Sequence, residues 1–212
     1  MRLTTKGSTS MSLLPESLPT VIPADHIPGP AQGHWTYNNY ATIPDDGKKY
    51  EVVDGVLFMS PSPNRGHQDV VVALAAYLWN HVNLGALGRA YSAPLDVELD
   101  AHIICQPDII VILNANLSIL SGSHIIGAPD LVIEVASPAT QIYDRNKKLN
   151  AYARSGIKEY WIADPIEHNI EVFFLEDTRY HSIGTFAGKT VIPSKILPAF
   201  SIPVENFFAF VL

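Results

Sequence analysis

Apolar and polar residues follow two different periods along the chain. Apolar residues recur every three or four positions between residues 67 and 82, and this spacing predicts a helix from about His67 to Val82. A second helix is predicted from Asp144 to Ser155, because an acid begins it and Gly156 follows its last residue. The remaining apolar runs are shorter and rich in β-branched residues, which is typical of strands.

The strand signals predict a mixed sheet. Asp54-Gly55 is a strong two-residue turn signal, so residues 50–59 should form a hairpin. Further strands are expected at residues 89–99, 103–113, 131–136, 159–163, 170–175, 179–183 and 190–192, with a loop over 114–127. This order predicts an α/β (α+β) fold, a mixed central β-sheet flanked by helices, with extra antiparallel strands near the end.

The chain of 212 residues is long enough for one sizeable core. Residues 1–36 are rich in proline and serine, so we expect an extended arm there and one domain over residues 37–212. Homodimerisation is a hypothesis based on this arm and on the apolar C-terminal end.

Composition narrows the cellular setting and the chemistry. No apolar run approaches the roughly 20 residues that span a bilayer, and residues 1–12 lack the apolar core of a signal peptide. The single Cys105 excludes an intramolecular disulfide and a cysteine zinc cluster. We therefore expect a cytoplasmic protein without membrane partners. The net charge of −7 argues against tight non-specific DNA binding, although basic residues gather between residues 145 and 158.

Two apolar strands each carry one acid, Asp108 after Pro107 and Glu134 between Ile133 and Val135. Ionised carboxylates are rarely buried unless they are paired or bind a metal. Two carboxylates with the main-chain carbonyl of Val135 would suit Mg²⁺ or Mn²⁺ rather than Zn²⁺. Such an ion polarises a phosphate oxygen and activates water. Lys148, on the same helix face as Asp144, is the candidate ammonium that assists.

Several ordered blocks resemble a known family. From about Tyr37 to the C-terminus, the chain resembles the Uma-type restriction endonucleases of the PD-(D/E)xK nuclease superfamily. The blocks that carry the likeness are Tyr50–Gly55, Ser60–Pro63 with His67, Glu134–Thr140, Asp144 with Lys148, Leu149 and Tyr152, and Gly156–Trp161.

The resemblance implies a restriction-endonuclease-like core in which Asp108 and Glu134 bind Mg²⁺. It further implies that Lys148 is the catalytic lysine and that Glu51 helps to hold the metal or its waters. The chain departs from the superfamily pattern at Ala136, where that pattern has lysine. A lysine from the next helix would replace it, and Lys147 is the alternative to Lys148.

Several of these residues also have a purely structural interpretation. His67 follows a Pro-rich turn and is more often structural in that position, but the resemblance keeps it as an accessory residue. Asp96 alternates with Glu98 and Asp100 along one strand, and of these three it is the one expected nearest the site. Asp108 alone could cap a strand or form a hydrogen bond with a loop backbone, and Glu51 could be an exposed cross-strand partner.

The leading hypothesis is a metal-dependent endonuclease that hydrolyses DNA. The first alternative is a catalytically inactive nuclease-fold module that binds nucleic acid or protein. The second is a structural protein that assembles through its Pro-rich arm and apolar end, with incidental acids.

Overall fold

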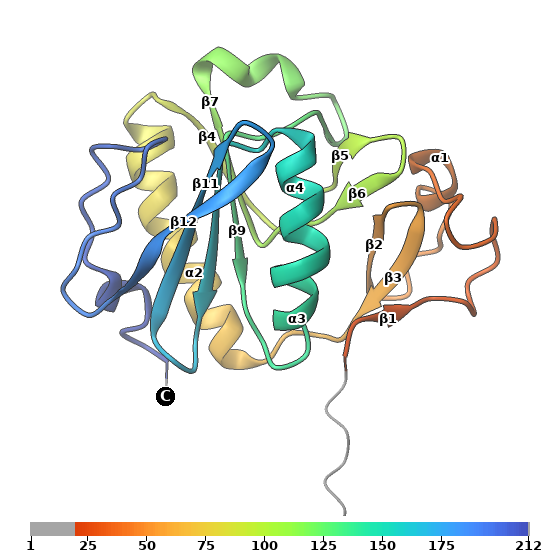
Figure 1. Ribbon diagram of the computed structural model, residues 1–212, viewed down its shortest axis with the longest axis horizontal. Helices are drawn as coiled ribbons and strands as arrows, with labels where there is room; N and C mark the ends of the chain where they lie inside the picture. The colour runs from red at the N-terminus through yellow and green to blue at the C-terminus, as the bar shows by residue number, and fades with distance from the viewer. Residues whose placement is uncertain (1–19, 212) are drawn as a thin grey trace, which may run out of the picture.

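The computed structural model describes residues 20–211, which form two six-stranded sheets with helices packed against them (Figure 1). One sheet has the longer strands and is called the larger sheet. It is mixed, because β9 and β10 run parallel and the other neighbours are antiparallel. Its strands, in spatial order, are β12 (Arg179–Ala187), β11 (Asn169–Glu176), β10 (Glu159–Asp164), β9 (Leu131–Val135), β7 (Ile109–Leu113) and β4 (Gly88–Ser92).

The smaller sheet gathers short strands from the first 126 residues. In spatial order they are β1 (Ile22–Pro23), β3 (Val56–Ser60), β2 (Lys49–Val53), β6 (Ile103–Cys105), β5 (Val97–Asp100) and β8 (Ile125–Ile126). The hairpin predicted over residues 50–59 is confirmed, because β2 and β3 pair directly. Asp54 and Gly55 have φ of 54° and 70°, as a two-residue turn of type I′ requires.

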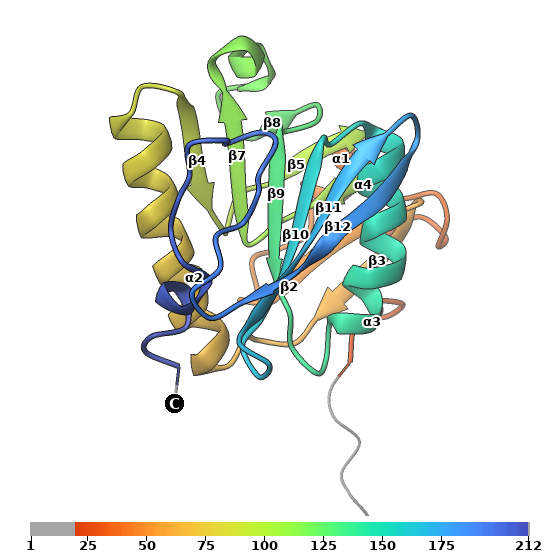
Figure 2. The same ribbon diagram turned by 60° about the vertical axis from the view of Figure 1, so that its left-hand side comes forward.

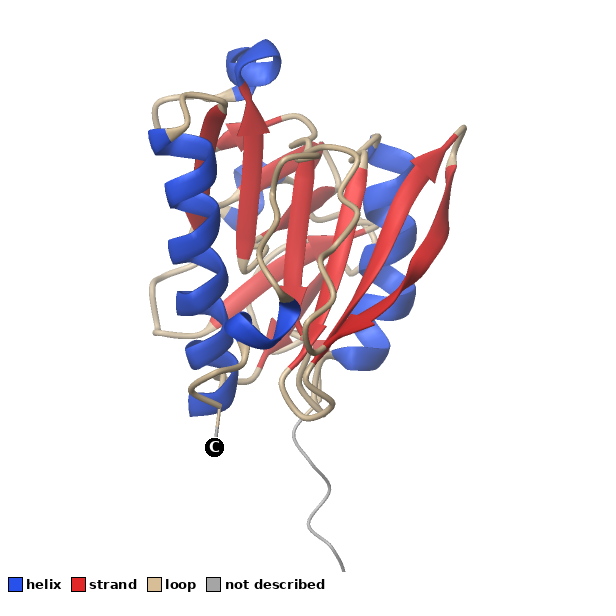
Figure 3. Ribbon diagram, turned by 90° about the vertical axis from the view of Figure 1, so that its left-hand side faces the viewer, coloured by secondary structure: helices blue, strands red, loops and turns tan. Residues whose placement is uncertain are grey.

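Different layers cover the two faces of the larger sheet (Figures 2 and 3). Helix α2 (Arg65–Trp79), its π-helical continuation Asn80–Leu84 and the chain end around the 3₁₀ turn Val204–Phe207 pack on one face. A second helical segment lies on the other face and consists of α3 (Gln141–Tyr143), a π-helical turn Asp144–Lys148 and α4 (Leu149–Ser155). The smaller sheet packs against this second face. The predicted mixed α/β fold is therefore confirmed.

Alternation along β9 assigns each of its side chains to a layer. Leu131, Ile133 and Val135 pack in the core with α2, whereas Val132 packs in the core with α4. Side chains two apart on a strand share a face, so Glu134 faces the layer that contains α4. The strand thus delivers one carboxylate to the layer between the larger sheet and α4.

Two of the predicted strands are wrong in extent. Residues 89–99 divide into β4 and β5, and residues 103–113 divide into β6 and β7, with the halves in different sheets. Pro94 and Pro107 fall in the two breaks. Proline lacks the N–H that a ladder needs, so each break lets the chain leave one sheet for the other.

Other boundaries also differ from the prediction. The expected loop over 114–127 contains a 3₁₀ helix, Asn114–Ile119, and the short strand β8. The expected strand over 190–192 is wrong, because Val191 forms only an isolated bridge with Pro203. The helix predicted from about His67 is α2, which begins at Arg65. The side chain of Asn64, just before it, accepts a hydrogen bond from the His67 N–H at 2.9 Å.

The ends of the chain contribute to both cores. The predicted arm falls partly outside the described residues, but its segment from residue 20 supplies β1 and the buried Trp35. The short helix α1 (Tyr37–Tyr40) follows. Near the other end, Phe207 and Phe208 are buried against the larger sheet. Among the described residues, none of the helices has the length and apolar character needed to cross a membrane.

Gly55 provides a test of the turn that fixes the β2–β3 register. A Cβ at Gly55 would lie 2.4 Å from the Gly33 carbonyl oxygen, whereas Gly47, also at positive φ, has open space around its Cα. Gly47→Ala should cost only the strain of positive φ, roughly 1 kcal/mol. Gly55→Ala should lower the free energy of unfolding by more, because the Gly33 backbone must also move. Urea denaturation of both variants checks this, and equal losses would contradict it.

Candidate active site

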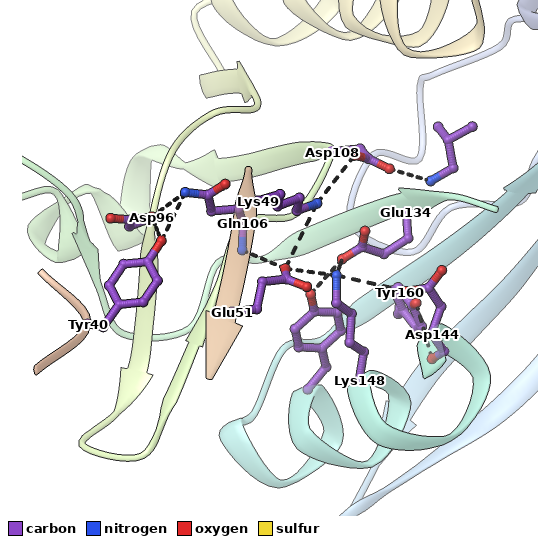
Figure 4. Close-up of polar contacts among 12 residues, drawn as sticks. Tyr40, Lys49, Glu51, Asp96, Gln106, Asp108, Glu134, Asp144, Lys148 and Tyr160 are labelled. Carbon is purple, nitrogen blue, oxygen red and sulfur yellow. Dashed lines mark hydrogen bonds and ion pairs between the residues drawn. The ribbon is translucent and has the colours of Figure 1, made fainter. Parts of the chain in front are cut away.

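Six ionisable side chains converge where the two sheets meet, and Figure 4 shows them. They are Lys49, Glu51, Asp108, Glu134, Asp144 and Lys148. All but Glu51 line a cavity of about 230 Å³, which is also lined by the loop 60–64 before α2 and the loop 137–140 before α3.

Asp108, just before β7, and Glu134, on β9, lie next to each other at the end of the antiparallel pairing between these strands. Ile109 pairs with Ile133, so Asp108 precedes one member of that antiparallel pair and Glu134 follows the other. Opposed residues of an antiparallel pair share a face of the sheet. The structure thus brings together the two acids that the sequence analysis selected.

Hydrogen bonds fix the orientation of Asp108 at the entrance to β7. Its Oδ2 accepts a hydrogen bond from the Val135 N–H at 2.8 Å and lies 3.0 Å from His67 Nε2. Burial raises the pKa of Asp108, but Lys49 and His67 outweigh it, so that the pKa lies well below its usual range. Asp108 is therefore an ionised carboxylate at neutral pH.

Lys148 is the central cation of the cluster. Its Nζ lies 2.9 Å from Glu134 Oε1 and 2.9 Å from Glu51 Oε1, and it is 3.8 Å from Asp144 Oδ1. Only 2% of the residue is exposed. Burial lowers the pKa of Lys148, but Glu134, Glu51 and Asp144 raise it well above its usual value, so the ammonium stays charged.

Lys148 is the last residue of the π-helical turn Asp144–Lys148, and its four-residue spacing from Asp144 places both side chains on the buried face. Asp144 and Lys148 are both buried, whereas Lys147 between them and Asn146 are exposed. The Lys147 side chain is thus directed to solvent and does not line the cavity.

Glu51 and Glu134 are held by different partners. Glu51 Oε1 accepts from the Gln106 N–H at 2.8 Å, and its Oε2 is buried with no hydrogen-bond partner among residues 20–211. Glu134 Oε1 accepts from the Tyr152 hydroxyl at 2.6 Å. Burial raises the pKa of Glu134, although Lys148 opposes this and Asp108 reinforces it.

The other accessory residues fall in different places. His67 is buried and lines the cavity, and its Nδ1 has no hydrogen-bond partner within the described residues. Asp96 does not line the cavity. Its Oδ1 accepts hydrogen bonds from the Tyr40 hydroxyl at 2.8 Å and from Gln106 Nε2 at 2.7 Å. Through Gln106, Asp96 supports Glu51 from behind, as Figure 4 shows.

Sequence reasoning missed three residues that the structure adds to the cluster. Lys49 precedes Glu51 by two positions on β2, so the strand period places both on one face. Asp144 and Tyr152 were named in the resemblance blocks, and Asp144 also as the helix start that places Lys148, but neither was given a role in the site. The four-residue spacing of 144, 148 and 152, which selected Lys148, is the signal that also indicates these two.

Acidic side chains outnumber basic ones in the cluster. Four carboxyl groups, of Glu51, Asp108, Glu134 and Asp144, face the two ammonium groups of Lys49 and Lys148, and the raised pKa of Asp144 keeps that one acid protonated at neutral pH. No group of three or more His, Cys, Asp or Glu side chains within residues 20–211 is already arranged to hold a metal ion. The oxygen donors that do line the cavity, Asp108 and Glu134 beside the main chain of Val135, are of the kind that Mg²⁺ and Mn²⁺ prefer.

The fold is shared with a solved structure from Anabaena variabilis ATCC 29413, described as "a putative nuclease belonging to DUF820". The TM-score is 0.70 at 20% sequence identity, and the match covers 84% of this chain and 99% of that chain. The two chains therefore share the mixed α/β architecture described above.

The chain belongs to the Uma2 family, described as "Putative restriction endonuclease", whose family model matches residues 37–205. This membership confirms the resemblance found in the sequence blocks. A curated relative, "Uncharacterized protein slr1290" of Synechocystis sp. (strain ATCC 27184 / PCC 6803 / Kazusa), is 25% identical over 133 residues. Those residues are 61% of this chain and 68% of the relative.

Asp144 should make the stability of the protein depend on pH. Burial raises its pKa to about 8, Glu134 adds to the rise and Lys148 opposes it. An unfolded aspartate titrates near pH 4, so between about pH 4 and pH 8 the folded state holds a proton that the unfolded state has lost. The contribution of Asp144 to the free energy of unfolding is therefore fully present below about pH 4 and is lost as the pH rises through about 8.

The measurement is urea denaturation of wild type and Asp144→Asn at pH 5 and at pH 8. The difference in unfolding free energy between the two proteins should shift in favour of the variant at the higher pH, because asparagine does not ionise. Asp177→Asn is the matched control, since Asp177 is exposed in a turn with φ of 55° that asparagine tolerates. A difference that is the same at both pH values would contradict the prediction.

Proposed function

We propose that this protein is a metal-dependent endonuclease that hydrolyses phosphodiester bonds of DNA at the cavity around Glu134. One observation carries the proposal: a buried lysine and opposed carboxylates from neighbouring strands share a cavity in a chain of the Uma2 family. Nuclease chemistry needs such a combination, because positive charge must offset the negative charge of a phosphodiester before water can attack the phosphorus.

Asp108 and Glu134 would hold the divalent cation, Mg²⁺ or Mn²⁺, together with the main-chain carbonyl of Val135. When bound, the cation supplies charge neutralisation at the phosphate and lowers the pKa of a water molecule. Lys148 and Tyr152 hold Glu134 Oε1 in place, and within residues 20–211 no hydrogen bond is found to the other carboxylate oxygen. Glu51 keeps Lys148 charged and in position.

In the reaction, the oxygen of a water molecule forms a bond to phosphorus while the bond from phosphorus to one sugar oxygen breaks. The water proton passes to a basic oxygen, and the leaving sugar oxygen takes a proton. Lys148 lies beside Glu134, so its positive charge favours the build-up of negative charge on the phosphate. His67, 3.0 Å from Asp108, keeps that carboxylate oriented.

A catalytically inactive module that binds nucleic acid or protein is the second candidate. The observation in its favour is that the protein's own lysines already neutralise part of the carboxylate charge, with Lys148 between Glu51 and Glu134 and Lys49 between Glu51 and Asp108. Cation binding and cleavage separate the two candidates, since an inactive module needs neither.

Cleavage should depend on Glu134 and Lys148 but not on Lys147. With Mg²⁺ or Mn²⁺, wild type should cut duplex or branched DNA, and Glu134→Gln and Lys148→Met should each reduce the rate by about 10²–10³-fold. Lys147→Met removes the same charge from an exposed neighbour and should cut at the wild-type rate. Gel assays of end-labelled DNA measure this, with circular dichroism to confirm folding. Failure of wild type to cut any of these DNAs would sink the nuclease proposal.

Cation binding should require both opposed acids. Titration calorimetry with Mn²⁺ should show binding to wild type that weakens at least about tenfold in Asp108→Asn and in Glu134→Gln, because each removes a charged oxygen ligand. Glu176→Gln, at an exposed position, is the control and should bind as wild type does. Wild-type affinity in both site variants would place the cation elsewhere.

A further inference from the structure

The two lysines of the cluster differ in how many N–H donors they have left. Lys148 Nζ has two carboxylate oxygens at 2.9 Å, so two of its three N–H donors are directed at protein groups, whereas Asp144 at 3.8 Å is beyond hydrogen-bond distance. Its side chain is only 3% exposed. An incoming phosphate oxygen would therefore have to reach an almost fully buried ammonium that already contacts two carboxylates.

Lys49 has the opposite character. Its Nζ lies 3.7 Å from Asp108 Oδ1 and 3.9 Å from Glu51 Oε1, both beyond hydrogen-bond distance, and no hydrogen bond of this ammonium is found within residues 20–211. Its side chain is 27% exposed and lines the cavity. The two long ion pairs hold Lys49 over the site without using its donors.

The position of Lys49 also suits a ligand that enters from the rim. β2 carries the partly exposed Lys49 at its first residue, in the cavity lining, and the buried Glu51 two positions further along the strand. Burial lowers the pKa of Lys49, but Glu51 and Asp108 raise it above its usual value, so the group is a cation at neutral pH. Figure 4 shows its ammonium between Asp108 and Glu51.

We propose that Lys49 is the residue of this cavity that donates hydrogen bonds to a phosphate oxygen of the nucleic-acid backbone, while Lys148 holds the carboxylates. The inference rests on the proposed function in taking a nucleic-acid strand as the ligand. An ammonium with free donors is a standard phosphate contact, and its ionic bond releases counterions from the strand.

The test is the salt dependence of oligonucleotide binding. Fluorescence anisotropy with a labelled single-stranded DNA, in Ca²⁺, follows wild type, Lys49→Met, Lys49→Arg and Lys48→Met, and gels confirm that the strand stays intact. Lys48 is the matched control: it precedes Lys49 in sequence, carries the same charge and lies outside the cavity lining, paired with Asp46.

Lys49→Met should bind roughly tenfold more weakly, and the slope of log affinity against log salt should lose about 0.7, the value for one phosphate contact on a single strand. Lys49→Arg should recover most of both quantities, because arginine keeps the charge and the donors. Lys48→Met should keep the wild-type slope. Urea denaturation of Lys49→Met checks that the partly exposed side chain is not needed for folding.

The outcomes separate this inference from the proposed nuclease. A slope in Lys49→Met equal to that of Lys48→Met, or no oligonucleotide binding by wild type, overturns the role of Lys49. Cleavage that persists alongside an unchanged slope leaves the nuclease standing and removes Lys49 from it. A slope that depends on Lys49 in a protein that never cleaves supports the phosphate contact and rejects the nuclease.

Discussion

The buried ammonium of Lys148 is the interaction on which the site depends. Two carboxylates on different sheets, Glu51 on β2 and Glu134 on β9, approach the same nitrogen at 2.9 Å. Removing an ion from water is costly, and only close opposite charges offset that cost in a protein interior. Loss of the lysine would leave two buried carboxylates facing each other, so the contact between the sheets at this point requires it.

The polar network extends this interaction to both sheets. Gln106 lies between β6 and β7, where the chain passes from the smaller sheet to the larger, and its N–H donates to Glu51. Its side chain donates to Asp96, which also accepts from Tyr40. One segment thus connects the sheets covalently and holds the carboxylate that steadies Lys148. The short contacts of Lys148 fix its position. The contacts of Lys49 are longer, so its N–H donors remain available to a ligand.

Much of the site was readable because strand and helix periods act locally. Acids inside β-branched runs singled out Asp108 and Glu134, and the helix spacing from Asp144 singled out Lys148. The antiparallel register of β7 and β9 then placed the two acids opposite each other. The fold class was predictable for the same reason, since the order of short apolar runs and two amphipathic segments allows few mixed α/β arrangements.

Other features were decided by the tertiary structure. The sequence alone determined most of the strand and helix segments, the burial of Glu134 and which family the chain resembles. It did not determine that residues 89–99 and 103–113 divide between two sheets, because an apolar run does not state its pairing partner. Nor did it place Lys49 in the site or Asp96 behind it, since both depend on how the smaller sheet packs against the larger one. Long-range packing, which no local period encodes, sets which charges meet and therefore which ammonium remains free.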